Sequence, residues 1–288
     1  MSSPALVAAA PVPPSSDTIS PRNFRRLAAF IFAHAGIKMP DSKKTLLEGR
    51  LRKRLRANNI ETFDDYCAFL FDEGGLEGER THLINAVTTN KTDFFREPGH
   101  FCYLEQAVLP EFRARGMRSV RAWSAACSTG PEAYSLAMML DEQSEARDGI
   151  SYCILATDLD TEVLAIARKG IYAEDLIEPV PAVYRHRYVR FSRDPGRREV
   201  RIAPTLRRAI GFAQLNLMDE RYPVGEPMDL IFCRNVLIYF DKETQMKVVS
   251  RLADCLAPGG YLFLGHSESI AGHCLPIVQV ANTVFKRS

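Results

Sequence analysis

An α/β fold is predicted from three features of this sequence. Residues 120–158 have the pattern of a strand, a turn of small residues that opens a helix, and a second strand that ends in an acid. Apolar runs predict a buried strand over 229–233 and a last strand over 261–264. In open α/β sheets the carboxyl ends of such strands hold ligands. The sequence therefore predicts an open sheet with a ligand site at one edge.

Residues 1–20 are predicted to form a disordered tail. They are rich in Ala, Pro and Ser, carry one charge (Asp17), and lack the basic start of a signal peptide. No stretch approaches the roughly 20 apolar residues that a membrane span requires. The 288 residues, 46% of them hydrophobic, are enough for one large domain and a small one. Seven cysteines without C-x-x-C spacing predict reduced thiols and a cytoplasmic protein.

Basic residues are concentrated in a helical region that follows the tail. Residues 21–60 carry eleven Lys and Arg against two acids, although the net charge of the chain is only +2. Ser20-Pro21 predicts the start of a first helix, with Ser20 as N-cap. A second helix is predicted over about 43–57.

The second helix is predicted to have an apolar side and a basic side. Leu47, Leu51 and Leu55 form a stripe at intervals of four residues. The cations beside that stripe are Lys43, Arg50, Lys53 and Arg54. This arrangement suits docking onto an acidic surface. Two alternatives remain: a solvated face with arginine stems lying on apolar surface, and a patch that binds nucleic acid phosphates.

Two further segments carry the chemistry that a ligand site needs. Residues 88–97 (TTNKTDFFRE) are dense in hydrogen-bonding side chains, which indicates a functional loop. The small residues of 125–130 let backbone N–H groups approach a ligand, and Asp158 ends the next strand, where it can accept hydrogen bonds from ribose hydroxyls. The spaced glycines of G-x-G-x-x-G are missing, which weakens a nicotinamide or flavin interpretation. The alternative is an ordinary loop with a solvated aspartate.

The second half of the chain adds a strand edge and a hairpin. The strand over 229–233 delivers Arg234, Asn235 and Tyr239 to its carboxyl end. Residues 184–204 alternate weakly, are rich in arginine and turn at 194–196, which is typical of an exposed hairpin. His266 is interpreted as structural. No His, Cys and Asp cluster has metal-ligand spacing, so no metal is predicted.

Taken in order, these segments resemble the chemotaxis receptor glutamate methyltransferases, the CheR family of S-adenosylmethionine-dependent enzymes. The segments that carry the resemblance are TTNKTDFFRE (88–97), WSAACSTGPEAYSLAM (123–138), ATDLD (156–160), NL (216–217), FCRNVLIYF (232–240) and GHSES (265–269). Six motifs in the family's order make chance agreement improbable. The resemblance extends over almost all of residues 21–288.

The resemblance implies a doubly wound, Rossmann-like methyltransferase domain with an N-terminal all-α domain and a small inserted antiparallel β-subdomain. The expected parts are the tail (1–20), a helical receptor-recognition domain (21–85), a linker that contributes to the cofactor site (86–100), and the S-adenosylmethionine-binding domain (101–288), with the insertion at about 184–213. In some relatives this subdomain grips a peptide at the receptor's C-terminus.

The resemblance also implies roles for individual residues. Asn90, Thr92 and Arg96 would contact the methionine moiety of S-adenosylmethionine, with Glu132 nearby. Asp158 would bind the ribose. Asn216, Leu217, Asn235 and Val236 would surround the adenine and the sulfonium. One departure is Pro131, which replaces the first acid of the family's S-T-G-E-E-P-Y. Proline is favourable at the first position of a helix, because the N–H that it lacks would have no helical partner there.

The implied reaction methylates the γ-carboxylate of receptor glutamates and leaves S-adenosylhomocysteine. It needs no general base, because a sulfonium methyl is already activated and a glutamate with a pKa of about 4.3 is already an anion. Arg96 and Tyr239 are the candidates for holding that carboxylate, with Arg234 a third. The acidic coiled coils of chemoreceptors would dock on Arg50, Lys53 and Arg54. We expect a monomer that binds no nucleic acid and reaches the membrane only through the receptor.

Two rival functions belong to other classes. A methyltransferase of nucleic acid bases would carry an Asn/Asp-Pro-Pro-aromatic motif, but residues 233–236 (CRNV) stand in that place. A methyltransferase of a small molecule stays open. A cofactor-binding regulator without catalysis would have degraded anchor residues, whereas Arg96 and Tyr239 are both present.

Overall fold

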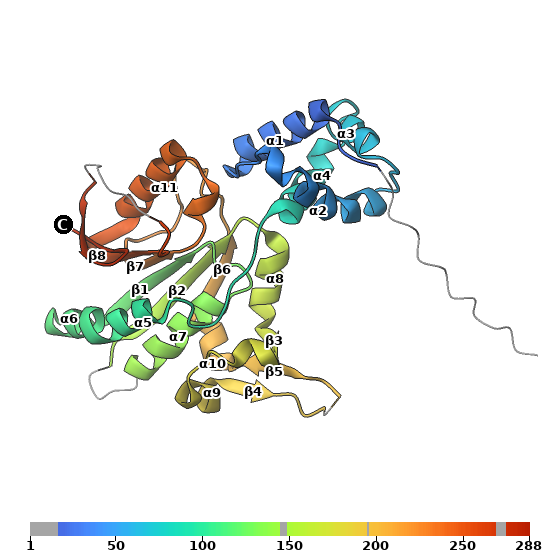
Figure 1. The fold of residues 1–288 in the computed structure, drawn as a ribbon. Coiled ribbons are helices and arrows are strands. Elements are labelled where there is room, and N and C mark those ends of the chain that lie inside the picture. Colours follow the sequence, from blue (N-terminus) through green and yellow to red (C-terminus); the bar gives the residue numbers. More distant parts are fainter. Residues whose placement is uncertain (1–16, 145–148, 195, 269–274) are drawn as a thin grey trace, which may run out of the picture.

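The computed structural model of the chain describes residues 17–144, 149–194, 196–268 and 275–288. The predicted tail up to residue 16, Pro195 of the predicted hairpin turn and Ser269 of the last motif lie outside the described residues. Figure 1 shows a group of N-terminal helices at one end of a large sheet and a small sheet at the other.

The N-terminal domain is built from helices whose apolar sides face one another. Its elements are α1 (Pro21–Ala35), η1 (Asp41–Lys43), α2 (Lys44–Ala57), α3 (Phe63–Phe71) and α4 (Leu76–Val87). Helix α1 begins as predicted, since Ser20 Oγ accepts a hydrogen bond from the backbone N–H of Asn23. It ends at Gly36, whose φ of 69° suits glycine. The predicted leucine stripe of α2 is buried inside this domain.

Five parallel strands form the main part of the large sheet. The described strands follow the order β6-β2-β1-β7-β8-β10-β9, in which β10 pairs antiparallel with both β8 and β9 and the other pairs are parallel. Their bounds are β1 (Ser119–Ala125), β2 (Ser151–Asp158), β6 (Ile210–Gln214), β7 (Met228–Cys233), β8 (Leu256–Leu264), β9 (Ile277–Ala281) and β10 (Val284–Arg287). The predicted α/β fold is confirmed.

Helices cover both faces of this sheet because side chains of a strand alternate between the faces. Phe232 of β7 packs with Phe263 of β8 on one face, whereas Ile231 and Leu262 pack on the other. The first face lies under α5 (Pro98–Tyr103), η2 (Leu104–Val108), α6 (Leu109–Ala114) and α7 (Pro131–Ser144). The second lies under α11 (Lys242–Cys255), which follows η4 (Leu237–Tyr239). Helix α8 (Thr161–Lys169) lies beside β6, as Figure 1 shows.

The small sheet consists of β3 (Ile171–Ala173), β5 (Glu199–Ile202) and β4 (Val189–Phe191), all antiparallel. It is accompanied by η3 (Glu174–Ile177), α9 (Ala182–Tyr188) and α10 (Pro204–Arg208). The sheet thus begins before the predicted range of about 184–213, and β6, inside that range, belongs to the large sheet. A three-residue strand such as β3 is too short for its alternation to be recognised in the sequence.

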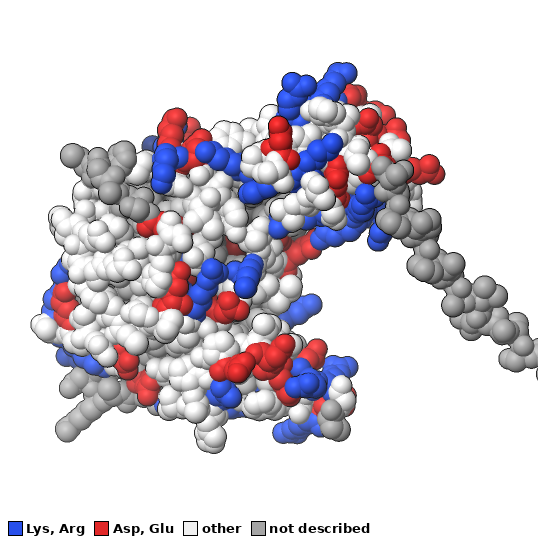
Figure 2. All heavy atoms as spheres, in the orientation of Figure 1, with Lys and Arg blue, Asp and Glu red and all other residues white. Residues whose placement is uncertain are grey.

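Basic side chains are unevenly spread over the face that Figure 2 shows. Lys and Arg side chains gather over the N-terminal helices and over the outer end of the small sheet, with a hollow between them. Among the described helices, none has the length and apolar character needed to cross a membrane.

Candidate functional site

A pocket opens at the carboxyl edge of the large sheet, under the N-terminal domain. Its position follows from the strand order, because β1 lies between β2 and β7 and the chain crosses from one side to the other there. The lining residues come from the ends of β1, β2, β6 and β7, from residues 87–96, and from the N-terminal domain.

The pocket brings together all the residues that the sequence selected for cofactor binding. They are Asn90, Thr92, Arg96, Glu132, Asp158, Asn216, Leu217, Asn235 and Val236. The three catalytic candidates, Arg96, Arg234 and Tyr239, line the same pocket, as does Arg50. Motifs far apart in the chain therefore meet around one space.

Asp158 ends β2 at the floor of the pocket. Its carboxylate accepts hydrogen bonds from the backbone N–H groups of Ser128 and Asp160, at 2.8 and 2.9 Å. Burial raises the pKa of this carboxyl to about 6, although the same hydrogen bonds lower it. Each carboxylate oxygen keeps a further lone pair that a ligand hydroxyl can use.

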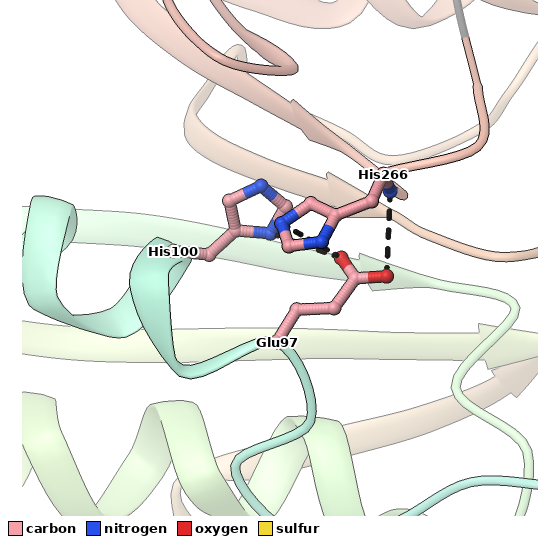
Figure 3. Close-up of side chains that lie close together, drawn as sticks. All are labelled: Glu97, His100 and His266. Carbon is pink, nitrogen blue, oxygen red and sulfur yellow. Dashed lines mark hydrogen bonds and ion pairs between the residues drawn. The ribbon is translucent and has the colours of Figure 1, made fainter.

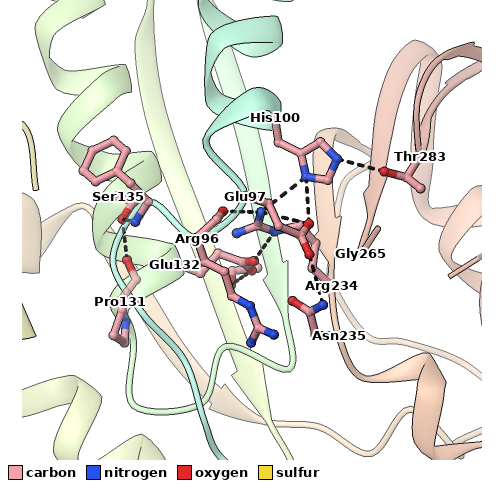
Figure 4. Close-up of polar contacts among 12 residues, drawn as sticks. Arg96, Glu97, His100, Pro131, Glu132, Ser135, Arg234, Asn235, Gly265 and Thr283 are labelled. Atoms are coloured by element: carbon pink, nitrogen blue, oxygen red, sulfur yellow. Dashed lines mark hydrogen bonds and ion pairs between the residues drawn. The ribbon is translucent and has the colours of Figure 1, made fainter. Parts of the chain in front are cut away.

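Glu132 and Arg234 form a buried ion pair beside the pocket (Figure 4). Arg234 Nε donates to Glu132 Oε2 at 2.7 Å, and Ser124 Oγ donates to Glu132 Oε1 at 2.6 Å. Arg234 Nη1 donates to the carbonyl of Arg96 at 2.6 Å, and the guanidinium lies over the ring of Phe101.

This geometry favours a positioning role for Arg234 over the predicted catalytic role, which stays a prediction. Only 2% of its side chain is exposed, and its strongest hydrogen bonds go to Glu132 and to the Arg96 carbonyl. We therefore propose that Arg234 is a positioning residue, which holds residues 96 and 132 where they line the pocket.

The loop after β7 is held by a glutamate that the sequence analysis did not select. Glu268 is 4% exposed, and its carboxylate accepts the backbone N–H groups of Asn235, Leu237 and Gly265. Burial raises its pKa, while these hydrogen bonds oppose the rise. Asn235 has a φ of 59°, a left-handed conformation that asparagine tolerates better than most residues. Glu268 lies in the GHSES motif, and this motif is the sequence feature that could have identified it as a functional residue.

Residues 88–97 run along the pocket as a strap between the two domains. Asn90 Nδ2 donates to Asp160 Oδ2 at 2.7 Å, and Ser128 Oγ donates to the Asn90 carbonyl at 2.8 Å. The side chain of Asn90 is thus used to fix the strap. In Figure 4 the guanidinium of Arg96 points away from the buried pair of Arg234 and Glu132. It is half-buried and donates to the carbonyl of Lys91 at 3.2 Å.

The segment after α1 closes the pocket from above. Asn216 Nδ2 donates to the carbonyl of His34 at 2.6 Å, and the backbone N–H of Lys38 donates to the carbonyl of Tyr239 at 3.0 Å. Lys43 Nζ lies 5.8 Å from the centre of the Tyr239 ring. The N-terminal domain therefore contributes part of the pocket wall.

Two of the three predicted partner-binding cations are used inside the protein. Arg54 donates to both oxygens of the buried Glu79, at 2.7 and 2.8 Å. Arg50 donates to the carbonyls of Val87 and Thr88, where it caps the end of α4. Lys53, by contrast, has 61% of its side chain exposed, with Glu162 at 3.9 Å.

Backbone strain is concentrated around this site. Among the described non-glycine residues, those at positive φ that lie in its loops are Phe95, Glu97, Ala126, Ser128 and Asn235. Such conformations cost free energy and persist where the surroundings enforce them, which is frequent at functional sites.

A second group of side chains meets just behind the pocket. Glu97, His100 and His266 point toward one another (Figure 3), with one ligand atom of each within 4.8 Å of the others. Glu97 and His100 are three residues apart, but His266 is distant in the sequence. Spacing along the chain therefore could not predict this cluster.

Comparisons with known proteins agree over most of the chain. The model of the CheR methyltransferase SAM-binding domain matches residues 90–284, and that of the CheR all-alpha domain matches residues 22–88. A chemotaxis protein methyltransferase of Borreliella burgdorferi is 38% identical over 253 residues, which is 86% of this chain and 88% of that protein. One of Escherichia coli is 39% identical over 253 residues, covering 88% and 86%. A probable chemotaxis protein methyltransferase of Rhizobium etli is 40% identical over 244 residues, covering 84% and 90%.

Proposed function

From the premise that the chain belongs to the CheR methyltransferase family, we propose that it methylates the γ-carboxylate of glutamates in the cytoplasmic helices of chemoreceptors. The observation that carries this proposal is the pocket, which gathers every family motif residue selected for cofactor or substrate around one space. A member of this family uses S-adenosylmethionine, and the glutamate specificity is the part that we propose.

The lining residues fit S-adenosylmethionine in chemistry. The Asp158 carboxylate would accept the ribose hydroxyls, and the small residues of 125–130 leave room for the cofactor backbone. Leu217 and Val236 offer apolar surface for the adenine. The positive charge of Arg96 would neutralise the carboxylate of the methionine moiety. S-adenosylmethionine supplies a methyl group already activated by its sulfonium.

The proposed transfer is a direct displacement. A carboxylate oxygen of the acceptor glutamate bonds to the methyl carbon while the bond from that carbon to sulfur breaks and its electron pair stays on sulfur. The products are the methyl ester and a neutral thioether. No proton moves, so the protein's task is in-line placement, which can contribute on the order of 7–11 kcal/mol.

Arg96 and Tyr239 are the side chains best placed to orient the acceptor. Both line the pocket and both are half-buried. A close bidentate arginine would stabilise the ground-state carboxylate and slow its attack. We therefore propose that Arg96 anchors the acceptor glutamate and that Tyr239 lines the position where the methyl group is transferred.

The acceptor helix is proposed to dock on the N-terminal domain. Basic side chains gather there on one side of the hollow (Figure 2). Of the three cations predicted to bind the partner, Lys53 is the one whose side chain is mostly exposed. Chemoreceptor methylation helices are acidic, so the charges are complementary. We further propose a cytoplasmic enzyme that works as a monomer and meets the membrane only through its receptor.

The proposal is tested with methyl-labelled S-adenosylmethionine and receptor-containing membranes. After incubation, the product is treated with mild alkali and volatile methanol is counted. Alkali-labile label on a receptor-sized band supports carboxyl methylation. Alkali-stable label would mean another acceptor, and absence of label despite cofactor binding would mean a regulator. Tyr239→Phe and Arg113→Ala, the latter on the distant helix α6, serve as the site variant and the control.

A further inference from the structure

The cluster behind the pocket contains two lone pairs that face each other without a hydrogen between them. His100 Nε2 lies 2.9 Å from Thr283 Oγ1, whose hydroxyl donates to the carbonyl of Asn282. Thr283 Oγ1 must then accept, so the proton of neutral His100 sits on Nε2 and its Nδ1 carries a lone pair. That atom lies 3.4 Å from Glu97 Oε2.

The second of these lone pairs belongs to Glu97 Oε2. Among the described residues, Glu97 Oε2 is buried and has no hydrogen-bond partner. A buried acceptor in this state is costly unless something else satisfies it.

The surroundings leave one negative charge in the cluster. Arg234 Nη1 donates a long hydrogen bond of 3.3 Å to His100 Nδ1 and lies 3.6 Å from Glu97 Oε2, and both distances exceed the 2.6 Å of its hydrogen bond to the Arg96 carbonyl. The charge of Arg234 is already balanced by Glu132 at 2.7 Å. The carboxylate of Glu97 therefore remains as the charge available to a cation.

From this geometry we propose that Glu97, His100 and His266 bind a divalent transition-metal ion, for which Zn²⁺ is the best fit. Two ligands of a tetrahedral zinc lie about 3.3–3.4 Å apart, given metal–ligand distances of about 2.0–2.1 Å. The separation of 3.4 Å between His100 Nδ1 and Glu97 Oε2 matches that value.

The third ligand requires a small movement that its exposure allows. His266 Nε2 lies 3.9 Å from Glu97 Oε2, and half of its side chain is exposed. A small ring rotation would bring it into range, with water as fourth ligand from the solvent side. His100 already has the outer-sphere partner typical of metal-binding histidines, since its other nitrogen donates to Thr283.

A bound metal would connect two segments that shape the pocket. Glu97 follows Arg96 in the strap, and His266 lies two residues before Glu268, which holds the loop after β7. The ion would therefore join the strap to the end of β8 and rigidify both. It would lie outside the pocket, whose lining includes none of its three ligands.

The test uses the untagged full chain, stripped with a chelator and then titrated with zinc chloride against a competing dye. We expect about one zinc per chain by elemental analysis, and a visible absorption band when Co²⁺ is used instead. His266→Ala should weaken binding by about 10-fold or more and abolish the band. His82→Ala, which removes an exposed histidine of α4, should leave both unchanged.

Stability provides a second readout. At one zinc concentration, zinc should raise the melting temperature of the wild type and of His82→Ala more than that of His266→Ala, because the stability gained from a bound ion grows with its affinity. Equal melting temperatures of the metal-free proteins would show that His266→Ala folds normally. The proposal is overturned if the wild type binds no zinc, or if His266→Ala and His82→Ala bind it equally well.

Discussion

The edge of the large sheet and the basic side of α2 were both selected from the sequence by their charged residues, but they use charge differently. At the sheet edge, Arg234 is enclosed and paired with Glu132. On α2, Arg54 is paired internally with Glu79, whereas Lys53 beside it is mostly exposed. The difference teaches that a run of cations indicates a binding partner only where the side chains are not already paired with acids or carbonyls of the same protein.

The largest effect is expected at the sheet edge. Arg234→Ala should lower the free energy of unfolding by about 3–5 kcal/mol, because it leaves the buried Glu132 without its cation. Chemical denaturation measures this change, and calorimetry should show that cofactor binding is lost with it. If Arg234→Ala stopped turnover but left stability and cofactor affinity intact, Arg234 would be a catalytic residue and the proposed positioning role would be wrong.

A matched pair on α2 separates internal from exposed charge. Arg54→Ala should lower the free energy of unfolding by about 3 kcal/mol, since Glu79 would remain buried and unpaired. Lys53→Ala should change it by less than about 0.5 kcal/mol, because an exposed ion pair contributes little. Equal effects of the two substitutions in thermal or chemical unfolding would remove the distinction between these neighbouring cations.

Cofactor affinity should depend on pH through Asp158. The carboxyl has a pKa of about 6 in the free protein, raised mainly by burial. If its ionised form accepts the ribose hydroxyls, affinity for S-adenosylhomocysteine is full above that pKa and falls as the pH drops through it. At pH 5 about one tenth of the molecules would be ionised, so binding should be about 10-fold weaker than at pH 7.

Asp158→Asn provides the control for that titration. The amide cannot ionise, so its affinity should be lower at pH 7 and nearly constant from pH 5 to pH 7. Calorimetry at several pH values gives both curves. A wild-type affinity that does not change over this range would place the ribose away from Asp158.

The smallest effect is expected at the docking surface. Lys53→Glu should reduce the rate of receptor methylation several-fold at low salt, because one exposed charge is worth up to about 1 kcal/mol. The deficit should shrink at high salt, where charges are screened. Arg113→Glu makes a comparable charge change on α6, far from α2 (Figure 1), and should not affect the rate. A loss common to both variants would point to net charge instead of docking.

Much of the fold and of the pocket could be predicted because the relevant signals are local. The strand ending at Asp158 and the strand ending at Cys233 are apolar runs, and the pocket lies at their carboxyl ends. The leucines of α2 reveal their burial by their spacing. In each case neighbouring residues carry the information.

The missed features depend on contacts between distant residues. Arg54 meets Glu79 from another helix, and His266 meets Glu97 across a separation of 169 residues in the sequence. Helical periodicity does not show which buried carboxylate an arginine will reach. The short strand β3 is recognisable only once Tyr172 pairs with Val200.

The central claim is that one pocket, built by both domains, holds the cofactor with its reactive end toward Arg96 and Tyr239. A crystal structure with S-adenosylhomocysteine tests it most directly. We predict ribose hydroxyls within hydrogen-bond distance of Asp158, the methionine moiety beside Arg96, and the sulfur facing Tyr239. A ligand bound elsewhere, or one in this pocket with its sulfur turned away from Tyr239, would contradict the account.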